Sequence, residues 1–293
     1  MEVRIDAGTR IERALEAALA RAGGPDAPPL LASAMRYAVF PGGARIRPRL
    51  ALGVAAACGG GAGELSEAAA ISIELMHCAS LVHDDLPCFD DASTRRGKIS
   101  VHCAFGEPLA VLAGDGLIVL AFEVLAHAGA AAPRRLAPLV STIAASTGMP
   151  HGIVAGQAWE SEPAIDLSLY HRAKTGALFS AATRAGALAA GGDPEAWRPL
   201  GELLGEAYQV ADDLHDIASD AEEIGKPTGQ DAAHGRASAP ALLGVEGAID
   251  RLESLVADAI ASIPPCDGAA ELKAVINFAA KRFVPKSLAR VAA

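Results

Sequence analysis

The chain has 293 residues, of which 51% are hydrophobic but only 4% aromatic, and its formal net charge is −10 at pH 7. This composition disfavours a β-rich fold, because strands prefer aromatic and β-branched residues, whereas alanine, abundant here, is the best helix former. The acidic charge argues against a nucleic-acid binder, which would carry a basic face.

Apolar residues recur at helical spacing along the chain, and strand-like alternation is scarce. The pattern predicts helices near residues 7–22, 30–39, 45–58, 64–85, 107–129, 133–147, 150–161, 166–191, 195–220, 237–262 and 267–283. Glycine- and proline-rich stretches such as RAGGPDAPP, FPGGAR and GGDP separate them. Because no linker is long or polar enough to divide domains, we expect one all-α domain over residues 1–293.

Three features bear on the location of the protein. The N-terminal stretch MEVRIDAGTRIERALEAALARAGG mixes acids and bases in an amphipathic pattern and lacks the apolar core of a signal peptide. The most apolar stretch, 108–133, is interrupted by Asp115 and Glu123, so we expect no stable membrane insertion. The cysteines have no metal-binding spacing, which indicates reduced thiols. These features predict a soluble, cytoplasmic protein.

Two acidic segments, LVHDDLPCFDD at 81–91 and QVADDLHDIASD at 209–220, each end an apolar helical run with two adjacent aspartates. Acids at a helix C-terminus oppose the helix dipole, so a bound cation would relieve an unfavourable arrangement. One such segment alone could equally be a charged helix end in solvent. Two of them, far apart in the chain, suggest two walls of one cavity.

The spacing of the aspartates fits a hard cation. Asp212 and Asp216 are four residues apart and share one helix face. Pro87 cannot continue a regular helix, so Asp90 can turn back toward Asp84. Magnesium is usually held by one or two carboxylates together with waters and substrate phosphate oxygens. The segments therefore predict a Mg²⁺ site at each wall.

Basic residues stand near the acidic segments or in apolar and glycine-marked surroundings. Gly42 and Gly43 open a turn before Arg45 and Arg47, and such a backbone can approach a phosphate closely. The other members of this basic set are Arg95, Arg96, Lys174, Lys226 and Arg236. Each could be an ordinary surface cation. Beside two acidic pairs, they predict a cavity for magnesium and more than one phosphate group.

The motifs GGARIRP, LVHDDLPCFDDASTRRGK, GQAWE, KTG, QVADD and ADDLHD…GKPTGQD resemble the ordered motif set of the trans-isoprenyl diphosphate synthases, from about residue 30 to about residue 245. Within that family, FPGGARIRP and AGQAWESE are most similar to the geranylgeranyl diphosphate synthases of pigment-producing purple bacteria. The resemblance implies an all-α isoprenoid-synthase bundle around a deep central cavity, Mg²⁺ as cofactor, isopentenyl and allylic diphosphates as substrates, and a homodimer.

The resemblance also implies roles for single residues. The implied magnesium ligands are Asp84, Asp85, Asp90, Asp212, Asp213 and Asp216. The implied allylic diphosphate ligands are Arg95, Lys174 and Lys226, with Arg236 as a further substrate-binding residue. The implied isopentenyl diphosphate ligands are Arg47, His77 and Arg96, although His77 could equally be a packed core histidine. The implied catalytic set, which stabilises the allylic cation, is Lys174, Thr175 and Gln209.

Four positions depart from the family pattern. Ala44 replaces a lysine that would bind isopentenyl diphosphate, and Cys103 stands where a lysine often follows the histidine. Glu160 replaces an aspartate and Arg236 a lysine, so these two positions keep their charge. The adjacent Arg45 could compensate for Ala44, but the sequence does not show whether it does.

Product length in this family is read below the first aspartate motif. Ala79 and Ser80 lie about one helical turn, or roughly 5 Å, deeper than Asp84. Because both side chains are small, they leave the pocket open to a longer chain. We favour a twenty-carbon product over a fifteen-carbon product.

Three other functions share part of this pattern. A terpene cyclase or head-to-head synthase would have the acidic motifs without a second diphosphate site at 42–48. An HD-type phosphohydrolase would use His83 and Asp84 as metal ligands but needs further histidines, and His77 is the one candidate nearby. A catalytically weak partner subunit of a true synthase is suggested by Ala44 and Cys103 and opposed by the intact aspartate motifs.

Overall fold

The computed structural model describes residues 6–60, 63–218, 238–280 and 283. The helices in these ranges are α1 (Ala7–Ala22), α2 (Pro29–Val39), α3 (Ile46–Ala57), α4 (Glu64–Asp84), α5 (Val101–Phe105), α6 (Glu107–Gly129), α7 (Pro133–Thr147), α8 (Ile153–Ala158), α9 (Leu167–His171), α10 (Ala177–Ala190), α11 (Arg198–Ala218), α14 (Ala239–Ala261) and α15 (Ala269–Ala280). The all-α prediction is confirmed, and most predicted helix ends lie within two residues of those observed.

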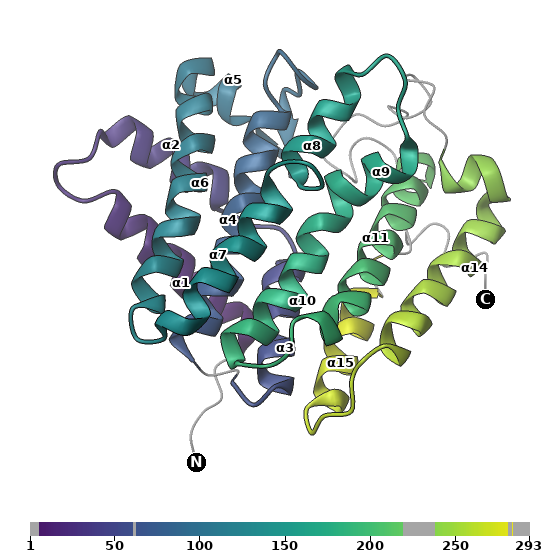
Figure 1. The fold of residues 1–293 in the computed structure, drawn as a ribbon. Coiled ribbons are helices and arrows are strands. Elements are labelled where there is room, and N and C mark those ends of the chain that lie inside the picture. Colours follow the sequence, from purple (N-terminus) through teal and green to yellow (C-terminus); the bar gives the residue numbers. More distant parts are fainter. Residues whose placement is uncertain (1–5, 61–62, 219–237, 281–282, 284–293) are drawn as a thin grey trace.

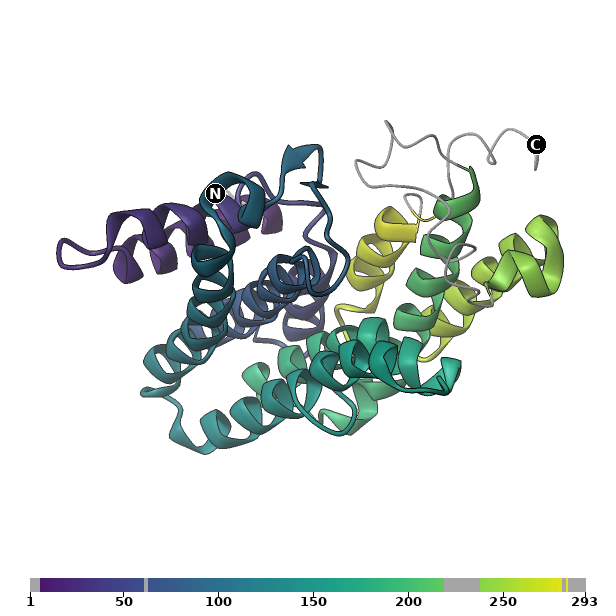
Figure 2. The ribbon, with the colours of Figure 1, turned by 90° about the horizontal axis from the view of Figure 1, so that it is seen from above.

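Helix α4 is the centre of the bundle. It packs most extensively against α6 and also against α3 and α10, while α1, α2 and α14 lie at the edges (Figures 1 and 2). Its side chains Ile73, Leu75 and Met76 are fully buried. Because the acidic motif is the last turn of this helix, the core rigidly sets the position of Asp84.

Small residues let neighbouring helices approach closely. A Cβ added at Gly186 on α10 would lie 2.3 Å from the carbonyl oxygen of Ala51 on α3, and one at Gly205 on α11 would lie 2.7 Å from the Cα of Gly176. Only glycine fits at such contacts. The close approach brings α11 against the short π-helical turn η2 (Arg172–Gly176), which carries two predicted site residues.

The segment between α4 and α6 contains elements that the sequence pattern did not predict. Strands β1 (Thr94–Arg95) and β2 (Lys98–Ile99) form a two-stranded antiparallel hairpin, and α5 follows it. Two-residue strands are too short to show an alternating pattern, so the sequence carried no periodic signal for them.

Two helices, α4 and α6, are long and apolar enough to cross a membrane by length and composition. In α4, 78% of the apolar window is buried inside the bundle, as expected of a core helix. In α6 the buried share is 44%, which leaves one apolar face of this helix uncovered.

Candidate active site

The backbone turns back on itself after α4. The amide of Asp90 donates to the carbonyl of Asp84 (3.0 Å), and the amide of Ala92 donates to the carbonyl of Asp85 (3.2 Å). These bonds satisfy carbonyls that the helix leaves unpaired at its end. Helix α4 ends at Asp84, before Pro87, and the chain then brings Asp90 back toward Asp84, as the sequence predicts.

The carboxylates of Asp84 and Asp90 form an acidic pair beside two cations. Partial desolvation, followed by the negative charge of Asp84, raises the pKa of Asp90. Lys174 Nζ lies 3.3 Å from Asp84 Oδ1, and Arg95 Nη2 lies 3.6 Å from Asp84 Oδ2. Repelling carboxylates fit a divalent cation, since a cation would remove their repulsion.

Within the ranges that the structure describes, no three His, Cys, Asp or Glu side chains converge as a complete ligand set. Magnesium needs no such set, because it retains waters and takes substrate phosphate oxygens. The pair Asp84 and Asp90 therefore fits magnesium brought in with a diphosphate better than it fits a metal in a permanent protein cage.

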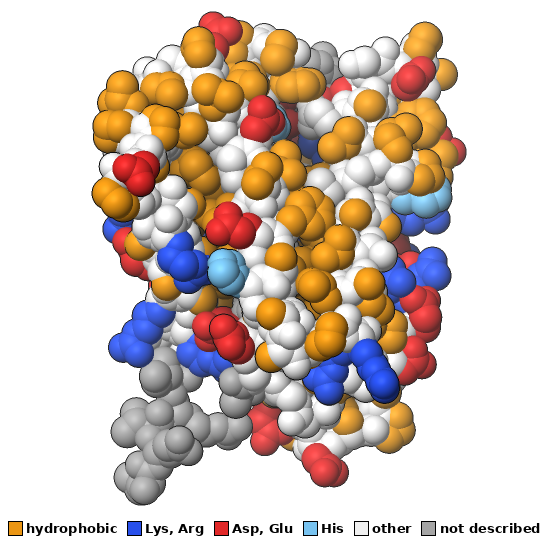
Figure 3. All heavy atoms as spheres, turned by 60° about the vertical axis from the view of Figure 1, so that its left-hand side comes forward, with side chains coloured by type: hydrophobic (Ala, Val, Ile, Leu, Met, Phe, Trp, Pro, Cys, Tyr) orange, Lys and Arg blue, Asp and Glu red, His pale blue; other side chains and the backbone are white. Residues whose placement is uncertain are grey.

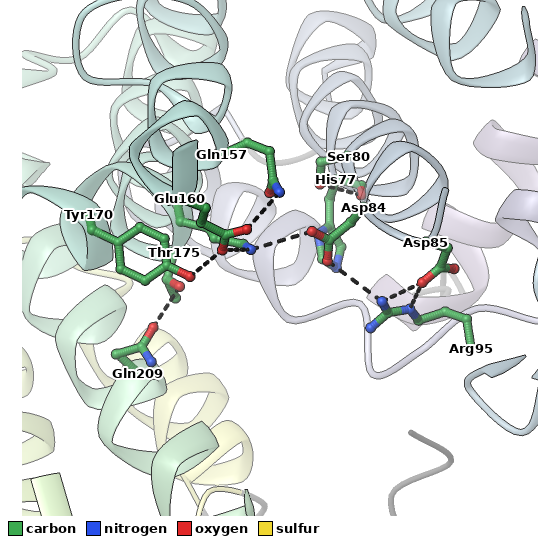
Figure 4. Close-up of polar contacts among 11 residues, drawn as sticks. His77, Ser80, Asp84, Asp85, Arg95, Gln157, Glu160, Tyr170, Thr175 and Gln209 are labelled. Carbon is green, nitrogen blue, oxygen red and sulfur yellow. Dashed lines mark hydrogen bonds and ion pairs between the residues drawn. The ribbon is translucent and has the colours of Figure 1, made fainter. Parts of the chain in front are cut away.

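Asp85 binds Arg95 of the β1–β2 hairpin. Its side chain is buried, and Oδ1 accepts hydrogen bonds from Arg95 Nε (2.8 Å) and Nη2. Burial raises the pKa of Asp85, and the hydrogen bonds from Arg95 oppose this effect. These contacts count against the predicted metal role of Asp85, and we propose instead that it holds Arg95 in place (Figure 4).

The turn of the hairpin presents Arg96 to His77. Both turn residues, Arg96 (φ 54°) and Gly97 (φ 71°), have the positive φ of a type I′ turn, which is strained for arginine. Arg96 Nη2 lies 3.3 Å from His77 Nε2. Burial, followed by the charges of Arg47 and Arg96, lowers the pKa of His77 well below its usual range. His77 is therefore a neutral hydrogen-bonding group between two arginines.

Arg47 is buried beside these residues with unused hydrogen-bonding capacity. Its guanidinium lies over the rings of Phe179 (4.5 Å) and Tyr208 (5.4 Å), and its Nε has no hydrogen-bond partner. Burial lowers the pKa of Arg47, and the charge of Asp212 on α11 is among those that oppose this. A buried donor without a partner is costly, so the site is suited to an anionic ligand.

A glycine turn lies next to the same arginines. A Cβ added at Gly43 would lie 3.3 Å from the guanidinium of Arg96, and one at Gly42 would overlap the guanidinium of Arg45. Because Gly42 and Gly43 have no side chain, other groups can approach the backbone of this turn closely, as the sequence predicts for a phosphate-binding turn. Arg47, His77 and Arg96 thus lie together as predicted, and their geometry fits a second diphosphate.

Arg45 does not compensate for Ala44. Arg45 is buried and donates to Glu74 (2.6 Å), Glu12 (2.8 Å) and the carbonyl of Val39 (2.8 Å). Its left-handed backbone, φ 52°, turns the side chain into the core at the start of α3. The Arg45 side chain therefore binds residues of α1, α2 and α4 and is not available to a substrate.

Lys174 belongs to a cluster around Glu160. Lys174 Nζ donates to Glu160 Oε1 (2.5 Å), and Tyr170 OH donates to the same oxygen (2.6 Å). Gln157 Nε2 donates to Glu160 Oε2 (2.9 Å). Burial by itself would lower the pKa of Lys174, but the charges of Asp84, Tyr170 and Glu160 raise it. Lys174 is fixed as a cation between Asp84 and Glu160.

Tyr170 was not predicted as a site residue. It lies four residues before Lys174, so the two side chains share one helix face. This spacing was the one available signal, and it does not distinguish a site tyrosine from a packed one. The contact of Tyr170 with Glu160, which comes from a different helical segment, is visible only in the fold.

A second hydrogen-bonded chain leads from η2 to α14. Thr175 Oγ1 donates to Gln209 Oε1 (2.7 Å), and Gln209 Nε2 donates to Asp213 Oδ1 (2.9 Å). Asp213 is 4% exposed, and its Oδ2 accepts from the amide of Ala239 (2.8 Å). These contacts count against a metal role for Asp213. We propose that it anchors Gln209 and the start of α14.

Asp212 and Asp216 lie on one face of the continuous helix α11, as predicted. Asp212 is exposed and Asp216 is half-buried, in contrast to buried Asp213. The predicted substrate ligands Lys226 and Arg236 lie outside the described residues.

The proposed chain-length residues lie on α4 before Asp84. Ala79 is 1% exposed and Ser80 is half-buried. Ser80 Oγ donates to the carbonyl of His77 (2.9 Å), so its polar group is satisfied within its own helix. Neither side chain has the bulk to obstruct a hydrocarbon chain along this helix.

The chain is similar to known proteins over most of its length. The family model for polyprenyl synthetase matches residues 28–275. The chain is 59% identical to a geranylgeranyl diphosphate synthase of Cereibacter sphaeroides, covering 96% of this chain and 97% of the relative, and 52% identical to one of Rhodobacter capsulatus, covering 96% and 99%. The resemblance inferred from the motifs is confirmed.

A solved structure is similar over almost the whole chain. The geranyltransferase of Helicobacter pylori, complexed with magnesium and isoprenyl diphosphate, has a TM-score of 0.76 and 28% identity, and covers 96% of this chain and 100% of its own. Fold, motif geometry and sequence similarity lead to the same assignment: the chain belongs to the polyprenyl synthetase family.

Proposed function

We propose that this protein is a prenyltransferase that condenses isopentenyl diphosphate with allylic diphosphates and yields mainly geranylgeranyl diphosphate. The observation that carries this proposal is the presence of two neighbouring anion sites of different kind. One combines Asp84 and Asp90 with Lys174, and suits a diphosphate bound with magnesium. The other combines Arg47 and Arg96 around neutral His77, and suits a diphosphate held by arginine alone.

The proposed reaction begins when the allylic carbon–oxygen bond breaks and negative charge develops on the leaving diphosphate. Lys174 and Arg95 lie where they can neutralise that charge. Magnesium, held by Asp84 and Asp90 and by Asp212 and Asp216, would supply Lewis-acid stabilisation of the same charge. The protein's own cations fix the diphosphate before the bond breaks.

The allylic cation is then stabilised by oxygen dipoles until the isopentenyl double bond attacks it. The Thr175 hydroxyl donates a hydrogen bond to Gln209 Oε1, so the lone pairs of Thr175 Oγ1 remain available to a cation. The new carbon–carbon bond forms between the allylic carbon and the isopentenyl double bond, and the released diphosphate takes up the proton whose loss restores a double bond. The apolar helices exclude water, which would otherwise capture the cation.

The twenty-carbon product follows from the small side chains of Ala79 and Ser80. They would let a fifteen-carbon primer lie along α4 and accept one further unit. Both bacterial relatives named above are geranylgeranyl diphosphate synthases, which supports this product over a fifteen-carbon one. We place the protein in the cytoplasm, where it would supply a precursor for carotenoid biosynthesis.

We further propose that the chain is a homodimer formed through α6. Val111, Leu112 and Val119 on this helix are 41%, 50% and 65% exposed, and hydrophobic side chains spread over this side of the molecule (Figure 3). An exposed apolar face of this kind is typical of a subunit interface. Val119→Glu is expected to give monomers in analytical ultracentrifugation, whereas Val154→Glu, exposed on α8, leaves the dimer intact.

The direct test is an elongation assay with purified protein, magnesium, labelled isopentenyl diphosphate and the five-, ten- or fifteen-carbon allylic diphosphate. The products are dephosphorylated and sized by chromatography. A twenty-carbon alcohol is expected, and Ser80→Phe should shift the product to fifteen carbons. A fifteen-carbon wild-type product would contradict the chain-length proposal. No elongation by folded protein would favour the catalytically weak partner subunit.

A further inference from the structure

The β1–β2 hairpin carries Arg95 and Arg96 and lies beside α2 and α4. A partly open pocket of about 40 Å³ lies between the hairpin and these helices. The pocket is lined by Tyr37, Pro41, Cys78, Leu81, Asp85 and Lys98, among others. At this pocket the hairpin is joined to α2 by individual polar contacts.

Lys98 and Tyr37 make such contacts in both directions. Lys98 Nζ donates to the carbonyls of Phe40 (2.7 Å) and Tyr37 (3.3 Å), at the C-terminal end of α2. In return, Tyr37 OH donates to the carbonyl of Ile99 on β2 (2.8 Å). The ammonium group also lies 3.5 Å from the centroid of the Tyr37 ring. The hairpin and α2 are thus joined by reciprocal bonds.

The Tyr37 ring is itself held by its surroundings. It packs edge-on against Phe105 of α5, with ring centroids 5.3 Å apart. A cation at a helix C-terminus also satisfies carbonyls that the helix leaves unpaired and interacts favourably with the helix dipole. The Tyr37–Lys98 pair therefore defines a fixed distance between the end of α2 and the hairpin.

The end of α2 leads directly into the glycine turn. Phe40, whose carbonyl Lys98 binds, is followed after one residue by Gly42 and Gly43, and Gly43 faces the Arg96 guanidinium. We propose that Tyr37 and Lys98 are positioning residues that set the gap between the Gly42–Gly43 backbone and Arg96. This gap is one border of the isopentenyl diphosphate site, so the inference rests on the proposed function.

The allylic site is held independently. Arg95, on the same hairpin, is tied to Asp85 and Asp84, and Lys174 is tied to Glu160. Loss of the Tyr37–Lys98 contacts should therefore weaken binding of isopentenyl diphosphate much more than binding of the allylic substrate. A merely structural role would weaken both equally.

The test uses full-length Lys98→Met, Lys98→Arg and Tyr37→Phe, with Lys273→Met, an exposed lysine of α15, as control. KM is measured for each substrate in the elongation assay, and binding of isopentenyl diphosphate alone is measured by calorimetry. We expect Lys98→Met to raise KM for isopentenyl diphosphate by about tenfold and Tyr37→Phe by about threefold, as for lost hydrogen bonds. Lys98→Arg should recover most of the affinity, since it can donate to the same carbonyls.

An equal rise of both KM values, or no rise with active wild-type protein, would overturn the positioning role. If Lys98→Met does not fold, judged by its melting temperature, Tyr37→Phe decides, because it removes one hydroxyl and keeps the ring. If the wild type binds isopentenyl diphosphate without elongating it, the proposed reaction fails, and calorimetry still tests the positioning role. If the wild type neither binds nor elongates it, both proposals fail.

Discussion

The two acidic segments look alike in sequence, but they are built differently. At the end of α4 the helix stops, and the carboxylate that joins Asp84 comes from a loop residue, Asp90, that turns back. On α11 the helix continues, and Asp216 follows Asp212 by one turn. A similar string of aspartates therefore ends in a loop in one segment and lies within a continuous helix in the other.

Within each adjacent pair the two aspartates have opposite surroundings. Asp84 is half-buried and Asp212 is exposed, whereas Asp85 and Asp213 are 2% and 4% exposed and bind protein groups. Two adjacent aspartates of the same type can therefore have different surroundings and different partners. We propose that the first residue carries the chemistry and that the second fixes a cation or a helix start that the chemistry needs.

The largest effect is expected at the first aspartate of each pair. Asp84→Asn and Asp212→Asn should each lower kcat/KM for the allylic substrate by about 10³-fold, because each removes charge that binds the metal and hence stabilises the leaving diphosphate. Incorporation of labelled isopentenyl diphosphate measures this. Asp250→Asn, at an exposed position on α14, is the control and should be unchanged. Full activity of Asp212→Asn would show that α11 is not a wall of the reaction centre.

Substitution of the second aspartate of each pair should lower stability more, and activity less, than substitution of the first. Asp85→Asn and Asp213→Asn should each lower the free energy of unfolding by about 2 kcal/mol, because each weakens buried hydrogen bonds to a carboxylate. Activity should fall by only about tenfold to hundredfold through misplacement of neighbours. Urea unfolding followed by circular dichroism, together with the elongation assay, separates the two effects. Complete inactivation of Asp85→Asn without loss of stability would restore its predicted role as a metal ligand.

A smaller effect is expected at Glu160 and Tyr170, which connect to Asp84 through Lys174. Glu160→Gln should lower kcat/KM for the allylic substrate by about tenfold, because Lys174 loses a charged partner. Tyr170→Phe should lower it by about threefold, because one hydrogen bond to Glu160 is lost. The KM for isopentenyl diphosphate should stay unchanged in both variants. A change in that KM would show that the two diphosphate sites are not independent.

The smallest effect concerns stability at mildly acidic pH. Because the pKa of His77 is lowered in the folded protein, the unfolded chain binds a proton there more readily than the folded chain. The wild type should therefore lose stability as the pH falls below about 6.5, the ordinary pKa of histidine. His77→Asn should remove about 1–2 kcal/mol of this loss between pH 7 and pH 5. An identical pH dependence in both proteins would mean that the pKa of His77 is the same in the folded and the unfolded chain.

The sequence by itself determined the class of fold and most of the helices. Helical periodicity depends on residues a few positions apart, so 64–85 and 107–129 were readable as α4 and α6. The order of the aspartate, lysine and glycine motifs was equally readable, because it is a property of the chain. Even the reversal after Asp84 followed from Pro87, whose ring acts on its own neighbourhood.

Only the tertiary structure decided what each polar residue binds. By sequence Arg45 could serve a substrate, but it is buried against Glu12 and Glu74, which come from two other helices. Asp85 and Asp213 could not be told from Asp84 and Asp212 by type or spacing. Their partners come from segments 10 and 26 residues away, at Arg95 and Ala239. Such contacts arise when the helices pack, and local sequence carries no record of them.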